Sequence, residues 1–190
     1  MATITVNSQD LGDAGTIDTY GIYKGESVDE QIIDDYNEEH NTDYNYDDFD
    51  WSYDHKQIVK DLAKLRAEAL QNDVDIIHSV KVLETGSPRE YNFSTDWATF
   101  EIDYDEDAVE KYVKDTKEKY DDWYRDSGWY SATEWRDDDD PRKAENIRIA
   151  KLDYYLNTKA LPTFDDWYWA VGEYESEIYF ENTTATPKKK

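Results

Sequence analysis

The chain contains no cysteine, which excludes disulfides, thiolate nucleophiles and metal sites built on cysteine. It also contains no apolar run that approaches the roughly 20 residues of a membrane-spanning helix. The first residues, Met1 to Ile4, show neither the basic stretch nor the apolar run of a signal peptide. These absences predict a soluble protein of a reducing compartment, without membrane association.

Motifs for catalysis and for metal binding are missing as well. Neither metal-ligand spacing nor catalytic-triad spacing relates the three histidines, His40, His55 and His78. The alternating acids from Asp103 fail as a calcium loop, because its sixth position is Ala108 and its twelfth is Lys114. No glycine-rich phosphate loop and no nucleophile elbow occurs. We therefore expect no metal, no cofactor and no enzymatic activity.

Basic residues are scarce, since 21 Lys and Arg stand against 46 Asp and Glu and leave a net charge of -25. Nucleic acid and anionic lipid repel such a surface, whereas basic proteins attract it. An aromatic content of 15% supplies large apolar faces for a core. The sequence therefore predicts a folded, acidic protein with a basic protein as its partner and no direct contact with nucleic acid.

Secondary structure follows from the spacing of the apolar residues. Helical spacing, together with capping patterns, predicts helices over residues 28–39, 54–71, 106–124 and 141–156. Alternating or β-branched runs predict strands over residues 2–7, 20–24, 76–83 and 100–105. Short strands that follow one another favour antiparallel pairing. The predicted fold class is α+β, a small antiparallel sheet packed with three to five helices.

Three further segments complete the predicted organisation. Residues 40–54 lack a clear period and are predicted to be loop. Residues 165–181 fit both a helix and a strand, and the helix is favoured. The chain then divides into an acidic N-terminal segment at 1–53, an α+β core at 54–182 and a disordered tail at 183–190.

The acids are distributed unevenly along the chain. No Lys or Arg occurs between Lys24 and Lys56, whereas the stretch from Asp29 to Asp54 holds eleven acids, and a further cluster begins at Asp137. Ordinary solvated surfaces mix the two signs, so these stretches are the candidate binding surface. The predicted partner-binding residues are Asp34, Asp35, Glu38, Glu39, Asp43, Asp47, Asp48, Asp50, Asp137, Asp138 and Asp139.

The charge per length of such a protein is comparable to that of DNA. Because B-DNA carries one charge per about 1.7 Å of axis, 25 charges correspond to roughly 40 Å of duplex. A compact chain of this length is about 40 Å across. If the acids lie along one ridge, that ridge resembles a duplex to a protein that holds phosphates with Lys and Arg.

In size, charge, aromatic content and absence of cysteine, the chain resembles the small acidic inhibitors that phages and mobile elements carry against host defences. These include DNA-mimicking antirestriction proteins and anti-CRISPR proteins. Two blocks within residues 76–158 also resemble a phage-borne family from which no functional residue can be transferred, namely Ser87-Pro-Arg-Glu-Tyr-Asn-Phe-Ser-Thr-Asp96 and Asp126-Ser-Gly-Trp-Tyr-Ser131. The resemblance implies an inhibitor in the cytoplasm of a bacterial host, bound to a defence nuclease or a CRISPR effector.

Two other functions stay open at this point. An acidic interaction or assembly module would bind a basic protein without imitating DNA. A carbohydrate-binding or carbohydrate-active domain would use tryptophans and a pair of carboxylates. The sequence leaves the oligomeric state open, a homodimer included.

Overall fold

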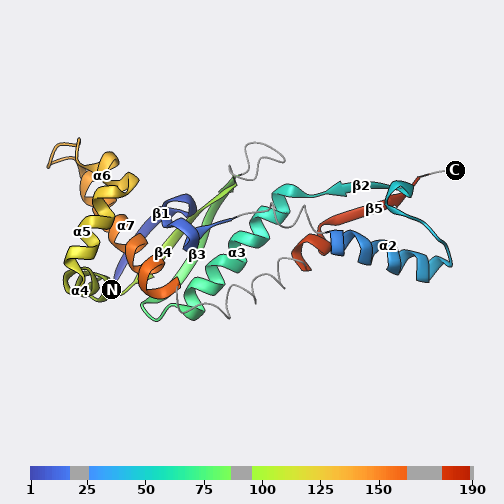
Figure 1. Cartoon of the computed structure of the whole chain (residues 1–190), viewed down its shortest axis with the longest axis horizontal. Coiled ribbons are helices and arrows are strands. Elements are labelled where there is room, and N and C mark those ends of the chain that lie inside the picture. Colours follow the sequence, from blue (N-terminus) through green and yellow to red (C-terminus); the bar gives the residue numbers. More distant parts are fainter. Residues whose placement is uncertain (18–25, 87–95, 162–176, 189–190) are drawn as a thin grey trace.

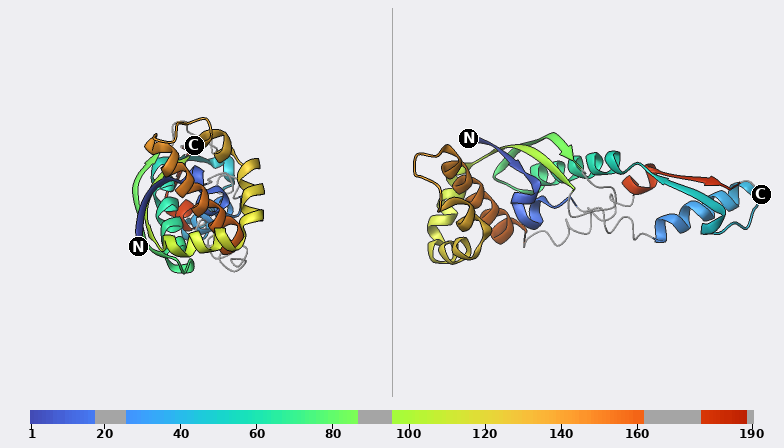
Figure 2. Two further views of the ribbon diagram at one scale, coloured as in Figure 1. Left: turned by 90° about the vertical axis from the view of Figure 1, so that its left-hand side faces the viewer. Right: turned by 90° about the horizontal axis from the view of Figure 1, so that it is seen from above.

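The computed structural model describes residues 1–17, 26–86, 96–161 and 177–188. The molecule is elongated (Figure 1), and the view from above in Figure 2 shows the same outline. A three-stranded sheet and four helices form one end, a helix and a two-stranded sheet form the other, and one long helix lies between them. The elongated shape replaces the compact body about 40 Å across that chain length alone predicts.

The larger sheet is antiparallel, with strand order β1-β4-β3. Its strands are β1 (Ala2–Asn7), β3 (Ile77–Gly86) and β4 (Trp97–Tyr104). Along β4 every second side chain is buried, including Phe100, Ile102 and Tyr104, because successive side chains of a strand point to opposite faces. The strands predicted at 2–7, 76–83 and 100–105 are confirmed.

Helix α3 (His55–Asp73) packs against β3 and carries much of the core. The Asp54 carboxylate caps its first turn by accepting from the N–H of Gln57, and Ile58 and Leu70 on one helix face are buried. This confirms the helix predicted at 54–71. Among the described helices, none is both long enough and apolar enough to cross a membrane.

Four helices lie beside the larger sheet at the same end of the molecule (Figure 1). They are α4 (Glu106–Asp115), α5 (Lys117–Asp126), α6 (Gly128–Thr133) and α7 (Pro141–Tyr155). The single helix predicted at 106–124 is wrong, because the chain leaves helical geometry at Thr116. The Thr116 hydroxyl donates to the Tyr112 carbonyl, which also accepts from the Thr116 N–H, and it accepts from the Tyr154 hydroxyl. The start of α7 is confirmed, with Asp140 as cap and Pro141 in the first turn.

Two irregular helices join the N-terminus to α7. A 3-10 segment, η1 (Ser8–Gly15), follows β1, and a π-helical turn, η4 (Leu156–Ala160), continues α7. The Asn157 side chain lies between them and donates to the carbonyls of Leu11 and Asp153. Gly12 has a φ of 56°, which brings its Cα close to the Asn157 amide.

The opposite end contains α2 (Glu26–His40), a short 3-10 turn η2 (Tyr46–Asp48), β2 (Phe49–Tyr53) and β5 (Thr183–Pro187). Helix α2 confirms the prediction at 28–39. The loop predicted at 40–54 and the disordered tail predicted at 183–190 are wrong, since β2 and β5 pair antiparallel with Phe49 opposite Pro187. Each strand is completed by a partner far away in sequence, which local patterns cannot reveal.

The fold class is therefore α+β, but with two small antiparallel sheets instead of one. The predicted strand at 20–24 and the part of the 165–181 prediction up to residue 176 lie outside the described residues. Residues 177–181 are helical, and the buried Tyr179 among them stacks on Tyr53 of β2 at 5.3 Å between ring centres.

Candidate protein-interaction surface

Helix α2 exposes five of its acids on one face, whereas Asp29 is half-buried and accepts from the Tyr179 hydroxyl. The apolar side chains Ile32, Ile33 and Tyr36 of α2 are half-buried, whereas the opposite face exposes Glu30, Asp34, Asp35, Glu38 and Glu39. These positions follow the i, i+4 spacing of a helix, so the carboxylates form two neighbouring rows. The four residues predicted on α2 therefore lie together and face solvent.

The spacing of these carboxylates is close to that of phosphates on one nucleic-acid strand. The exposed face carries five acids over residues 30–39, which is about 15 Å of helix at the usual rise per residue. That is one charge per about 3 Å, compared with one per about 3.4 Å along a single strand of B-DNA. The comparison concerns charge per length only.

The segment after α2 is held against the helix and presents further acids. Asn41, with a φ of 49°, ends α2, and the Asn37 side chain fixes the next turn by accepting from the N–H of Tyr44 at 2.8 Å. In this segment and in β2 the exposed acids are Asp43, Asp47 and Asp50. We call residues 29–54 the acidic end.

Asp48 differs from the other acids predicted as partner-binding. It is half-buried, and its carboxylate accepts from the N–H of Asn45 at 2.9 Å, which completes a capping box on η2. Its carbonyl accepts from the N–H of Lys188, so β5 brings one basic residue to the acidic end. The structure gives Asp48 a local structural role, which the sequence did not indicate.

An aromatic cluster underlies the acids, and the sequence did not predict it. Tyr36 of α2 stacks on His40 at 4.0 Å and meets the buried Phe49 of β2 edge-on at 5.2 Å. Tyr46 and Trp51 stack at 4.9 Å, and half of Tyr46 is exposed. These rings give the acidic end large apolar faces close to its carboxylates.

Most carboxylates of the acidic end form no ion pair within the part of the chain that the structure describes. Among the described residues no base forms an ion pair with seven of the predicted acids, which are Asp34, Asp35, Glu38, Glu39, Asp43, Asp47 and Asp50. Like charges at i, i+4 on a helix disfavour it by about 0.2–0.5 kcal/mol per pair. The arrangement therefore does not stabilise α2, and it leaves the charge available to a partner.

The acids Asp137, Asp138 and Asp139 do not belong to this surface. They lie in the connection between α6 and α7, at the other end of the elongated molecule (Figures 1 and 2). Asp138 pairs with the Lys143 ammonium at 2.9 Å. Next to them, the hydrogen bond from the Arg142 guanidinium lowers the pKa of Asp140 to about 2. The predicted acids thus form two separate groups, and the condition that all of them lie along one ridge is not met.

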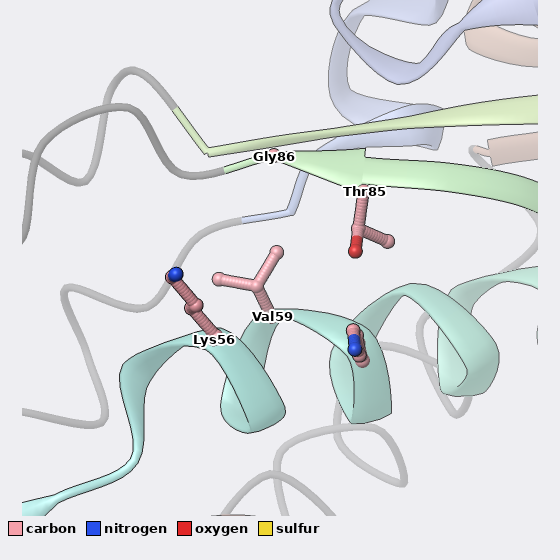
Figure 3. Close-up of a pocket in the computed structure, with 5 residues that line it drawn as sticks. Lys56, Val59, Thr85 and Gly86 are labelled. Atoms are coloured by element: carbon pink, nitrogen blue, oxygen red, sulfur yellow. The ribbon is translucent and has the colours of Figure 1, made fainter.

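Between the two ends lies a hollow of about 240 Å³ (Figure 3). Its charged lining residues, among those described, are lysines. Lys56, Val59 and Lys60 of α3 line it from one side, and Thr85 and Gly86 of β3 from the other. No acid lines this hollow among the described residues, so it is not a continuation of the acidic end. Elsewhere in the described ranges, no group of three or more His, Asp or Glu side chains could hold a metal ion.

Comparisons with protein-family models, with characterised proteins and with solved structures gave no match to this chain. The resemblance to phage anti-defence proteins therefore stays a prediction, and the functional argument rests on the surface just described.

Proposed function

We propose that the protein inhibits a basic, nucleic-acid-binding host protein by occupying its nucleic-acid site with the acidic end. The observation that carries this proposal is the exposed face of α2, with one carboxylate per about 3 Å of helix and no ion pair to a base among the described residues. A site evolved to hold successive phosphates with Lys and Arg meets a similar linear density of charge there.

The acidic end, and not the whole protein, would imitate nucleic acid, and it would imitate only a short stretch of it. The eleven acids of the acidic end correspond to about 19 Å of duplex at the charge density of B-DNA. These acids are distributed over α2, the segment after it, β2 and the cap of α3, so this length applies to the acidic end as a whole.

Charge and aromatic rings would contribute in different ways to such a complex. The net charge of -25 steers a basic partner toward the protein and accelerates association, an effect that weakens with salt. The exposed part of Tyr46, stacked on Trp51, offers apolar area that carboxylates cannot supply. Buried aromatic anchors commonly carry most of the binding free energy in protein complexes.

The test begins with capture of the partner from a bacterial lysate on the immobilised wild-type chain, followed by its purification. Association and dissociation rates are then measured for wild type and for two variants with equal charge change. The acidic-end variant is Asp34→Asn, Asp35→Asn, Glu38→Gln and Glu39→Gln. The control variant, at exposed acids of α3 and α5, is Glu68→Gln, Asp73→Asn, Glu118→Gln and Asp126→Asn.

We expect the acidic-end variant to lose at least about tenfold in affinity, mostly through slower association, and the control to lose much less. Equal losses in both variants would reduce the effect to net charge and contradict a defined surface. A complex that forms without affecting nucleic-acid binding by the partner would favour the acidic interaction module instead.

A further inference from the structure

A second hollow, of about 380 Å³, lies at the helical end of the molecule and has an unusual lining. Its walls come from η1, from the start of α6 and from the middle of α7. The block Asp126 to Ser131, noted in the sequence, supplies Ser127, Gly128 and Trp129 to it. The volume is at the lower end of ligand pockets, so it suits a single side chain or a small molecule.

Asp153 forms one wall of this hollow and is 8% exposed. One carboxylate oxygen accepts from the indole N–H of Trp129 at 2.9 Å, and the other accepts from the Asn157 amide at 2.6 Å. Both donors are neutral. Within the described residues, no Lys, Arg or His forms an ion pair with Asp153. Buried carboxylates in proteins are normally paired with a cation, so this one lacks its usual partner.

A second carboxylate faces the same hollow. Asp10 of η1 lines it and stays exposed to solvent as a residue, and the partial burial of its carboxyl raises the pKa of this group. Burial is also the main reason why the pKa of Asp153 rises to about 6, and the negative charge of Asp10 adds to that rise. Among the described residues, two acids and no base line the hollow, and a cation is the group that would complement both carboxylates.

The chemistry of the lining favours an organic cation over a metal. Calcium and magnesium need about six oxygen ligands, and no group of three or more acidic or histidine side chains occurs here among the described residues. A guanidinium is planar, carries five N–H donors and binds carboxylates through two parallel hydrogen bonds. It also packs well against aromatic rings, and Trp129 is part of the wall.

We propose that this hollow binds the guanidinium group of an arginine side chain, held between Asp10 and Asp153 and supplied by the partner protein. The inference rests on the proposed function only in the choice of a basic partner. The site lies apart from the acidic end, so it would give the complex a second, geometrically specific contact.

The test follows the indole N–H signal of Trp129 by NMR in the full-length, ¹⁵N-labelled chain, with the signal assigned by its loss in Trp129→Phe. The chain is titrated at pH 7.5 with N-acetyl-arginine methylamide and, as a neutral analogue of the same shape, with N-acetyl-citrulline methylamide. We expect a saturable shift of the Trp129 signal with the arginine compound and binding weaker by about tenfold or more with the citrulline compound.

Two variants on the same 3-10 segment separate the site from overall charge. Asp10→Asn removes a carboxylate that lines the hollow, and Asp13→Asn removes an exposed carboxylate that does not. We expect about tenfold weaker binding for Asp10→Asn and less than a twofold change for Asp13→Asn. Asp10→Asn is preferred to a change at Asp153, because Asp153 also holds Trp129 and Asn157 in place.

The absence of a saturable shift, equal binding of the citrulline compound, or equal effects of the two variants would overturn the proposal. Free arginine, with its charged backbone groups, identifies the source of the guanidinium. Weaker binding of free arginine than of the blocked compound supports a side chain of a polypeptide, and stronger binding contradicts a protein partner here. Because the titration uses the isolated chain, its failure leaves the proposal for the acidic end untouched.

Discussion

The helical end and the acidic end contain many carboxylates but use them differently. At the helical end, Arg148 of α7 donates two hydrogen bonds to Glu106 of α4, and Lys151 pairs with Glu110 one turn later. In the acidic end, the exposed carboxylates of α2 have no base beside them among the described residues. These two acids at the helical end thus hold α4 and α7 together, whereas the acids on α2 add repulsion that a basic partner would relieve.

The largest expected effect comes from breaking the aromatic cluster beneath the acids. Phe49→Ala removes a ring that is 2% exposed and contacts Tyr36 and Tyr44. Truncation of a buried Phe costs about 3–5 kcal/mol. We expect β2 to lose protection in amide hydrogen exchange while β4 keeps it. The reason is that β2 and β4 belong to different sheets, so the acidic end should unfold locally while the larger sheet stays folded. Equal loss of protection in both strands would contradict this separation.

The next effect concerns Asp153, a buried carboxylate at the helical end that accepts from two neutral donors instead of pairing with a base among the described residues. Its folded-state pKa of about 6 lies above the ordinary 3.8, so folding favours the protonated form. Its contribution to stability is therefore full below pH 4 and is lost as the pH rises through 6. Between pH 7.5 and 4.5, wild type should gain about 2 kcal/mol relative to Asp153→Asn.

Urea unfolding of both proteins across this pH range measures that difference. The main titratable neighbour is Asp10, whose own pKa is raised by burial, so Asp10→Asn is measured in parallel. A difference between wild type and Asp153→Asn that does not change with pH would show that the folded carboxyl titrates normally.

A smaller effect is expected from removing one ion pair at the helical end. Arg148→Ala removes the pair with Glu106 and leaves a half-buried carboxylate, so we expect a loss of about 1–2 kcal/mol in the free energy of unfolding. The hydrogen bond from Arg148 lowers the pKa of Glu106, and the loss should therefore shrink as acid protonates Glu106. Chemical denaturation at pH 7 and at pH 3 tests this, and a loss that is independent of pH would contradict it.

The smallest effect is a gain in stability at the acidic end. The acidic-end variant, in which Asp34, Asp35, Glu38 and Glu39 are neutralised, loses like-charge repulsion on α2. Its free energy of unfolding should therefore be about 0.5–1 kcal/mol larger than that of wild type. The gain should disappear in high salt. A clear loss of stability in calorimetry would show that these acids serve the fold, and the contrast between the two ends would fail.

Local patterns predicted the elements whose determinants lie within a few residues. The alternation in β4 and the Asp140-Pro141 start of α7 are such signals. Strand β2 was missed because its partner β5 lies about 130 residues further along the chain. The break at Thr116 was missed because the apolar spacing continues across it, and its contact with the Tyr154 hydroxyl of another helix leaves no local signal.

The same distinction applies to the candidate sites. The acids of α2 are visible in the sequence because no base interrupts them. The ring contact between Tyr36 and Phe49 needs the fold to bring α2 and β2 together. Asp10 and Asp153 meet only through the packing of η1 on α7, and no spacing rule links residues so far apart.

The central claim is that the acidic end takes the place of nucleic acid on its partner. Fluorescence anisotropy of a labelled duplex bound to the purified partner tests this claim directly. Wild type and the acidic-end variant are added as competitors at two salt concentrations. We predict that wild type displaces the duplex, that the variant does so at least about tenfold less effectively, and that both complexes weaken as salt rises. A stable ternary complex of partner, duplex and wild type would contradict the claim.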